Sequence, residues 1–540
     1  MTAADFIESG NDFLNSGDID KAIEEYTQAI RLEPNDVNAY MSRGDAYRKK
    51  YDNNNENEDY GFDNESKQQQ IDNLNKAITD FTQVLHFVPD SISAYIKRGC
   101  AYIKKSHYDN DFHEFVLDEE EIHRQSVDLD KAIADLTYAI QLDPNNTDTY
   151  INRGDAYSSY KDYDNAIKDY TQAIKINPND INAYHKRGYT FSVDLKDYDS
   201  AISDYTQIIN VDSNNARAYI GRGAAYFNKN DYADALKDYT QAIKIDPNNR
   251  NAYYLRSLVY YNREDYDNVI ADYTQILNLE PNNTHYYIKR GTIYKEKDDY
   301  NNAIADYTQA IKIDPNNAEA YIERGDVYYF KKDYDTAIAN YTQAIKCTPN
   351  IFNSSYCYRN AYYYRGEAYR EKGDYDNAIA DYTQVINIDP NDIAAYINRG
   401  VTYDEKNDCD NAIADYNKAF KLDSNENEPN NESVAFLPIK FDCILSLDDM
   451  AIQKVLRETD SKTFTIEIKG EEGKNQNKVF INMSEMVVAM LKEGTEYFGH
   501  IRKNDMNETR EKILNVIRRL VQTGEIEIAK EQPSNGRIQE

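Results

Sequence analysis

The sequence has no tryptophan and five cysteines, none of which forms a CxxC pair: Cys100, Cys347, Cys357, Cys409 and Cys443. An odd, scattered set of this kind is typical of reduced thiols and not of a disulfide framework. No apolar run approaches the roughly 18 residues that a membrane-spanning helix needs. The opening MTAADFIESGNDFLNSGD lacks a basic region followed by an apolar one, so we expect no secretory signal. These absences predict a cytoplasmic protein without a membrane span.

Positive charge is also scarce, with 62 Lys and Arg against 94 Asp and Glu and a net charge of −32. The imbalance lies in the first 430 residues, which carry 46 basic and 75 acidic residues, because residues 431–540 hold 16 and 19. Such a segment repels phosphate backbones, so we expect no nucleic-acid partner. Two readings of the charge stay open, a basic protein partner and simple solubility.

Catalytic signatures are missing as well. The chain contains no P-loop, no GxGxxG, no HExxH and no GxSxG. His107, His113 and His123 lie among carboxylates, but their spacing matches no metal-ligand motif. We therefore expect no enzyme activity, no metal and no cofactor.

What the chain does have is a 34-residue period rich in its 50 tyrosines. Gly154 to Gly188, Gly291 to Gly325 and Gly366 to Gly400 each span 34 residues. Every unit reads as two amphipathic helices, because its apolar residues recur at spacings of three and four. Glycine allows the two helices to approach closely, and proline shortly after the second helix ends it.

This pattern resembles the tetratricopeptide repeat (TPR), with Tyr where that family most often has Trp. The resemblance covers residues 3–426 in eleven units, and we assign 1–426 to the array. The motif glycines are Gly10, Gly44, Gly99, Gly154, Gly188, Gly223, Gly291, Gly325, Gly366 and Gly400, with Ser257 in the seventh unit. The resemblance implies an all-α fold, a TPR α-solenoid in which each repeat contacts its neighbours.

Arginine precedes the motif glycine, or Ser257, in ten units, and aspartate precedes the second-helix aromatic in most of them. Examples are Arg153 with Asp169 and Arg222 with Asp238. We predict that these side chains pair within or between units and form a ladder.

Repeats two and three each carry 21 additional residues between their two helices. The first insertion, at 51–70, is polar, and we expect a loop or disorder. The second, at 106–125, is more apolar and could extend a helix. The role of both stays open.

In the TPR family the first helices line the concave surface, which implies that positions three before, one after and four after the motif glycine point inward. We propose a partner-binding groove for a protein or peptide from the inward residues of repeats five to nine: Tyr189, Phe227, Tyr254, Leu258, Tyr261 and Tyr329. Tyrosine buries a large area with few rotatable bonds, which suits recognition. The alternative is packing between adjacent first helices.

After a polar linker at 427–434 the period ends. Residues 435–530 contain three amphipathic segments, LDDMAIQKVLRE, NMSEMVVAMLKEG and NETREKILNVIRRLVQTGE, and predict a small helical bundle. We expect 531–540 to be a flexible tail.

The bundle resembles the C-terminal domain of the flagellar motor switch protein FliG, on LDDMAIQKVLRE, IKG, NMSE, MLKE and VIRRLVQTGEI. The resemblance implies a charged face, Lys469, Glu493 and Arg502, that meets the cytoplasmic loop of the membrane-embedded stator. Met486 and Gly494 stand where that family has charged residues. The sequence thus predicts a cytoplasmic adaptor whose array binds a partner and whose tail docks on rotor or stator proteins. The alternative is a general TPR scaffold or assembly chaperone with no motor role.

Overall fold

The computed structural model describes residues 1–55, 64–108, 119–347, 355–423 and 516. This part of the chain contains 22 α-helices and one π-helical turn, and no strand. The all-α prediction is confirmed. None of the described helices is both long and apolar enough to cross a membrane.

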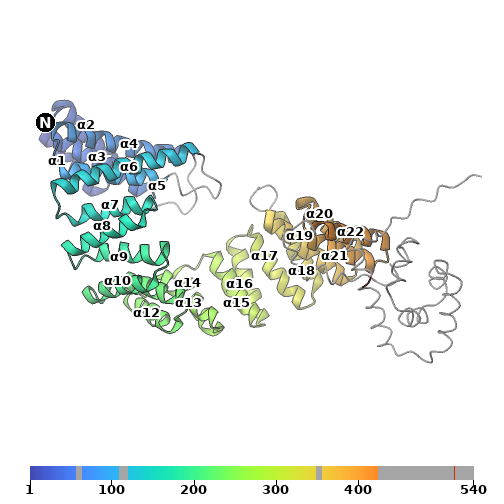
Figure 1. The fold of residues 1–540 in the computed structure, drawn as a ribbon. Helices are drawn as coiled ribbons and strands as arrows, with labels where there is room; N and C mark the ends of the chain where they lie inside the picture. Colours follow the sequence, from blue (N-terminus) through green and yellow to red (C-terminus); the bar gives the residue numbers. More distant parts are fainter. Residues whose placement is uncertain (56–63, 109–118, 348–354, 424–515, 517–540) are drawn as a thin grey trace, which may run out of the picture. The chain divides into compact units, whose positions relative to one another are not determined.

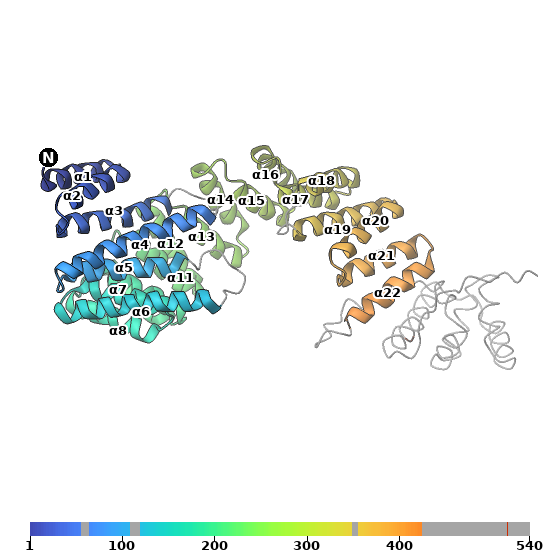
Figure 2. The same cartoon turned by 90° about the horizontal axis from the view of Figure 1, so that it is seen from above.

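The 22 helices follow one another as the first and second helices of eleven repeats, and the chain divides into two compact units at Asp272. Within unit 1 the hairpins stack in sequence order (Figures 1 and 2). The helices of unit 1 are α1 (Ala3–Ser16), α2 (Ile19–Leu32), α3 (Val37–Asn55), α4 (Asn64–Phe87), α5 (Ile92–Tyr108), α6 (Glu119–Leu142), α7 (Thr147–Ser159), α8 (Tyr163–Ile176), α9 (Ile181–Tyr189), the π-helical turn η1 (Thr190–Asp194), α10 (Tyr198–Val211), α11 (Ala216–Asn228), α12 (Tyr232–Ile245) and α13 (Arg250–Asn262).

Helix α14 (Tyr266–Leu279) contains the boundary between the units. Unit 2 continues with α15 (Thr284–Glu296), α16 (Tyr300–Ile313), α17 (Ala318–Phe330), α18 (Tyr334–Cys347), α19 (Ser355–Lys372), α20 (Tyr375–Ile388), α21 (Ile393–Glu405) and α22 (Cys409–Asp423).

Two adjacent residues set the turn between the first and second helices of a repeat. In repeat four, Lys161 takes a left-handed conformation with φ 61°, and Asp162 then caps α8 by accepting from the backbone N–H of Asn165. The same pair of positions recurs along the array, with Gly17 and Gly373 in the left-handed place in repeats one and ten. Aspartate satisfies an otherwise unpaired amide at the helix start, which is why the sequence repeats it there.

The hydrophobic core is a series of small clusters built largely from alanine and tyrosine side chains. In repeat four, Ala166, Tyr170 and Ala173 are buried against Ile151 and the next repeat's Ala183. A Cβ atom at Gly154 would lie 2.5 Å from Cε1 of Tyr170, so only glycine admits the ring at that crossing.

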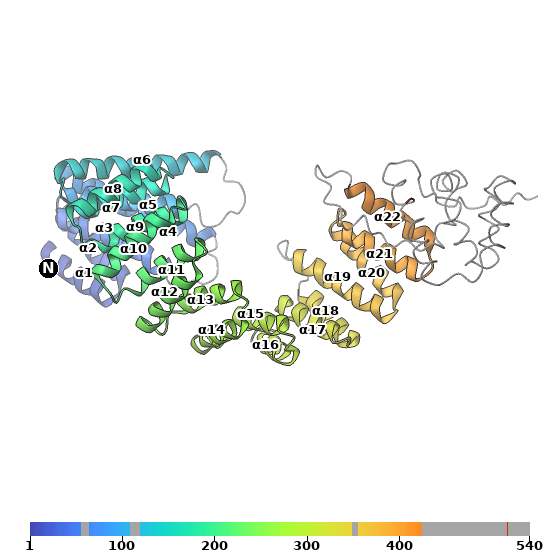
Figure 3. The same cartoon turned by 60° about the horizontal axis from the view of Figure 1, so that its bottom comes forward.

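The two insertions lengthen hairpins. α3 continues to Asn55 and α4 begins at Asn64, so the expectation of a loop at 51–70 is wrong for the described residues. Helix α6 begins at Glu119, so the described C-terminal part of the insertion at 106–125 extends the second helix of repeat three (Figure 3). Tyr51, Leu74 and Ala101 form a buried cluster between the two long hairpins. Apolar packing of this kind holds the polar segment in helical form.

Candidate functional site

Five of the six residues predicted for the partner-binding groove lie in unit 1, on the neighbouring first helices α9, α11 and α13. Tyr189 is 51% exposed and Tyr261 is 44% exposed. The other three are half-buried: Phe227, Tyr254 and Leu258. We call this set the unit 1 face.

Some of these rings also pack within their own repeat. The ring centroid of Phe227 lies 5.7 Å from that of Tyr232, and Tyr261 lies 6.0 Å from Tyr266. Each pair joins the end of a first helix to the start of the second. The packing fixes these rings while Tyr261 keeps a large exposed area.

Small residues separate the aromatic positions on α11. Gly221 and Ala224 are partly exposed there, and a Cβ at Gly221 would meet Cζ of Tyr205 at 2.6 Å. The Tyr205 ring therefore lies closer to Gly221 of the next repeat than to Gly188 of its own. Burial raises the pKa of Tyr205 to about 12, and its hydroxyl has no hydrogen-bond partner among the described residues.

A π-helical turn follows Tyr189 and exposes two further apolar side chains. Val193 is 53% exposed and Leu195 is 43% exposed. Sequence reasoning missed them, although Gly188 to Gly223 spans 35 residues instead of 34. One additional residue in a first helix is accommodated as a π-bulge, a feature that often marks functional sites.

The sixth predicted residue, Tyr329, lies on α17 in unit 2 and is therefore described separately from the five of unit 1. Its ring packs 5.6 Å from that of Tyr334. Burial, reinforced by nearby Glu367, raises the pKa of Tyr329 to about 12.

Unit 2 also places carboxylates on its first helices, which sequence reasoning did not identify. Asp326 accepts a hydrogen bond of 2.8 Å from the Tyr341 hydroxyl and lies 3.7 Å from Nζ of Lys295. Burial, reinforced by nearby Glu323, raises the pKa of Asp326 to about 7. No group of His, Cys, Asp and Glu in the described part of the chain is arranged to hold a metal ion.

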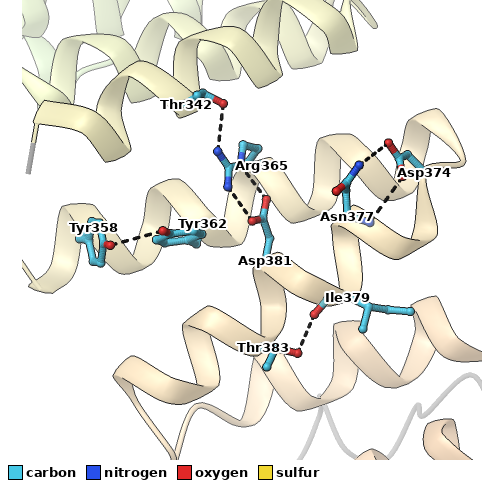
Figure 4. Close-up of polar contacts among 9 residues, drawn as sticks. All are labelled: Thr342, Tyr358, Tyr362, Arg365, Asp374, Asn377, Ile379, Asp381 and Thr383. Atoms are coloured by element: carbon cyan, nitrogen blue, oxygen red, sulfur yellow. Dashed lines mark hydrogen bonds and ion pairs between the residues drawn. The ribbon is translucent and has the colours of Figure 1, made fainter. Parts of the chain in front are cut away.

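The predicted arginine–aspartate ladder is present and holds the repeats in register. In repeat ten, Arg365 donates to both carboxylate oxygens of Asp381 at 2.7 Å and to the Thr342 hydroxyl of repeat nine at 3.0 Å (Figure 4). Its guanidinium also lies 5.2 Å from the ring centroid of Tyr362. Each such arginine, which we call a rung, therefore joins a repeat to the second helix before it.

Within the described ranges, nine rungs pair with aspartate: Arg43, Arg98, Arg153, Arg187, Arg222, Arg256, Arg290, Arg365 and Arg399. Arg324 is different because it meets Asn340, whose Oδ1 accepts from its Nε at 2.8 Å. Burial lowers the pKa of Arg324, whereas the pKa of Arg290 is raised by its bond to Asp306 despite burial. The charged face predicted at Lys469, Glu493 and Arg502 lies outside the described residues.

Family models match both parts of the chain. Those described as TPR repeat or tetratricopeptide repeat match residues 10–50, 147–180, 181–215, 216–249, 251–283, 291–331, 318–351, 366–407 and 393–426. The model described as FliG C-terminal domain matches residues 424–528.

Curated relatives match the C-terminal part. The flagellar motor switch protein FliG of Thermotoga maritima is 46% identical over 90 residues, which are 17% of this chain and 27% of that protein. FliG of Borreliella burgdorferi is 41% identical over 90 residues, 17% of this chain and 26% of that protein. The chain thus spans about a quarter of the length of these relatives.

Solved structures match part of the chain. The crystal structure of MamA has 30% identity, covers 31% of this chain and 92% of its own, and has a TM-score of 0.28. The yeast Tom70 structure has 18% identity, covers 78% and 92%, and has a TM-score of 0.32. On the family models, the chain belongs to the tetratricopeptide-repeat proteins and carries a FliG C-terminal domain at its end.

Proposed function

We propose that the chain is a non-enzymatic adaptor whose array holds a segment of a partner protein and whose FliG-like domain docks at the flagellar motor. The observation that carries the first half is the unit 1 face. Tyr189 and Tyr261 stay 51% and 44% exposed on first helices that flank the small residues of α11. Large exposed aromatics on neighbouring helices favour burial by a partner.

The second half rests on the match of residues 424–528 to the FliG C-terminal domain. Lys469, Glu493 and Arg502 keep the charges that the resemblance assigns to the stator-facing surface. Opposite charges across such a contact steer association and fix orientation. This role would locate the protein in the cytoplasm, at the cytoplasmic face of the motor.

A second candidate is a scaffold or assembly chaperone without a motor role. Met486 and Gly494 favour it, because two charges of the FliG surface are absent at these positions. The array would then act alone, and the C-terminal domain would be a docking module for another protein.

The experiment is cross-linking and co-purification of the tagged full chain from its source cells. Replacing Tyr189 and Tyr261 by Ala should reduce the array's partner by about fivefold or more, as expected for loss of aromatic anchors. Tyr160→Ala, at a tyrosine that is 46% exposed, is the matched control. If the double variant recovers as much of the partner as wild type, the proposal that the array binds a partner through this face is refuted.

Charge reversal tests the motor half in the same cells. Lys469→Glu with Arg502→Glu should remove rotor or stator proteins from the cross-linked set and leave the array's partner in place. Lys530→Glu, outside the matched segment, is the control. If the wild-type chain recovers no motor protein, the scaffold reading replaces the adaptor reading.

A further inference from the structure

Three carboxylates gather on the first helices of repeats nine and ten in unit 2. Glu323 and Asp326 belong to α17, and Glu367 belongs to α19. Lys295 of α15 contacts the first at 2.6 Å and the second at 3.7 Å. The side chains of Glu323 and Asp326 stay 24% and 19% exposed, so solvent reaches both. One ammonium therefore serves two partly buried acids.

Glu367 has no hydrogen bond and no ion pair among the described residues. Arg370, the cation that acts on Glu367, pairs within the described ranges only with Glu371, at 3.4 Å, and its Nε is buried there without a partner. Burial raises the pKa of Glu367, and Arg370 only partly opposes that rise. Within the described residues, this partly buried carboxylate therefore lacks a direct ion-pair partner.

Tyr382 of α20 supplies an independent observation. Its side chain is fully buried, and its hydroxyl oxygen has no partner in the described part of the chain. In repeat nine the equivalent tyrosine, Tyr341, donates to Asp326, which follows the motif glycine as Glu367 does in repeat ten. The ring end of Tyr382 lies against Gly366, the residue beside Glu367. Buried polar atoms without partners are rare and call for a missing ligand or water.

The cluster carries more negative than positive charge. Its acids are Glu323, Asp326, Glu367 and Glu371, and its bases are Lys295 and Arg370. Tyrosines facing it from α16, α17, α18, α19 and α20 are Tyr307, Tyr329, Tyr341, Tyr363 and Tyr382. Aromatic rings beside carboxylates are the surroundings in which proteins bind ammonium and guanidinium groups.

We propose that these residues form a subsite for a basic side chain, lysine or arginine, of the partner segment that the array binds. The inference rests on the proposed function of the array and assigns the partner's chemistry in unit 2. The incoming cation pairs with Glu367 and Asp326, its donors reach the Tyr382 hydroxyl, and its apolar stem lies along Tyr329. The excess of acidic residues in the array favours the same partner.

Binding at this subsite should release a proton. Near neutral pH Asp326 is partly protonated because its pKa is about 7. A bound cation favours the ionised carboxylate, so binding shifts that pKa downward and expels the proton. If binding needs the ionised form, affinity should rise about tenfold between pH 6 and pH 8.

The probe is a displayed library of random twelve-residue peptides, selected at pH 8 and 150 mM salt against the full chain. Selected peptides are then synthesised with each Lys or Arg kept or replaced by Gln. We expect at least one basic residue whose replacement weakens binding about tenfold or more. Calorimetry in two buffers of different ionisation enthalpy at pH 7 should detect proton release for the basic peptide alone.

Glu367→Gln should weaken the basic peptide about tenfold, and Tyr382→Phe should weaken it severalfold. Asp335→Asn removes an acid that is 78% exposed on α18 and should change affinity less than twofold. If Glu367→Gln leaves the affinity for the selected peptides unchanged, the inference is overturned. If the same peptides lose affinity for the Tyr189→Ala and Tyr261→Ala variants, the array still binds a partner but without this subsite. If no peptide is selected at all, both the proposed binding function of the array and the subsite are refuted.

Discussion

At the scale of single residues, the rung arginine performs several tasks with one side chain. Arg222 donates to both oxygens of Asp238 at 2.8 Å and to the Thr206 hydroxyl at 3.1 Å, and lies 5.6 Å from the ring centroid of Tyr219. Bidentate pairing to a carboxylate is both strong and directional. In repeat nine the rung Arg324 meets the uncharged Asn340 instead of an aspartate, which identifies a weak position in unit 2.

Asn340→Asp should complete that rung and strengthen repeat nine. The new carboxylate would accept from two nitrogens of Arg324 in a setting where other rung aspartates are nearly buried, so we expect about 1 kcal/mol of added local stability. Native-state hydrogen exchange of the α18 amides measures it. Asn301→Asp, at an exposed position of α16, controls for added negative charge, and equal exchange in both variants would contradict the prediction.

The raised pKa of Asp326 predicts that the stability of unit 2 depends on pH. Its folded pKa of about 7 is above the reference of 3.8, because burial and Glu323 disfavour the charged form. The stabilisation from its protonated form is complete below about pH 4 and is lost as pH rises through about 7. Between pH 6 and 8 wild type should lose about 1 kcal/mol more than Asp326→Asn, as read from urea midpoints. Parallel pH profiles of the two proteins would rule this out.

The pairing of Arg with Asp was predictable because both recur with the repeat. Three features were not predictable, because each depends on which neighbouring repeat lies against it. Among the described residues, they are the unpaired hydroxyl of Tyr205, the raised pKa of Asp326 and the absence of an ion-pair partner for Glu367. Sequence spacing places residues on a helix face, but burial and partners come from the stacking of hairpins.

At the scale of elements, the structure separates two ways of absorbing additional residues. The described parts of the 21-residue insertions continue as helix in α3 to α6, where Tyr51, Leu74 and Ala101 form a buried cluster. A single additional residue in repeat five becomes the π-helical turn after α9. Composition suggested a loop for 51–70, but contact between two equally lengthened hairpins outweighs local polarity.

A charge swap tests how a rung couples helices. Arg222→Asp alone places two carboxylates together and should loosen repeats five and six, and adding Asp238→Arg should restore part of the loss. The rescue should be incomplete because an aspartate at position 222 can neither donate to Thr206 nor stack on Tyr219. A double-mutant cycle on urea unfolding gives the coupling energy. Additive effects would show that the pair does not act as a unit.

At the scale of the molecule, the net charge of −32 works against compactness. Exposed acids repel one another over about 8 to 10 Å at moderate salt, whereas rung pairs are largely buried and are screened less. The array was predictable to this level because its period, charge and helix signals all agree, and the FliG resemblance of the C-terminal part was carried by its own motifs.

Raising NaCl from 10 to 300 mM should therefore raise the thermal midpoint of the full chain. Screening reduces the repulsion more than it weakens the rungs. Scanning calorimetry measures the shift, and an equal osmolality of glycerol separates ionic from osmotic effects. A midpoint that falls with salt would mean that exposed pairs such as Lys229 with Asp199 dominate.

The contacts made by the rungs also bear on how the array can evolve. Each inner repeat carries the arginine that bonds to the repeat before it and the threonine that accepts from the repeat after it, for example Arg222 and Thr240 in repeat six. A copied repeat therefore meets a matching surface on both sides as soon as it is inserted. Arrays of this kind can lengthen or shorten by gene duplication and loss of whole repeats, without a new interface having to evolve each time.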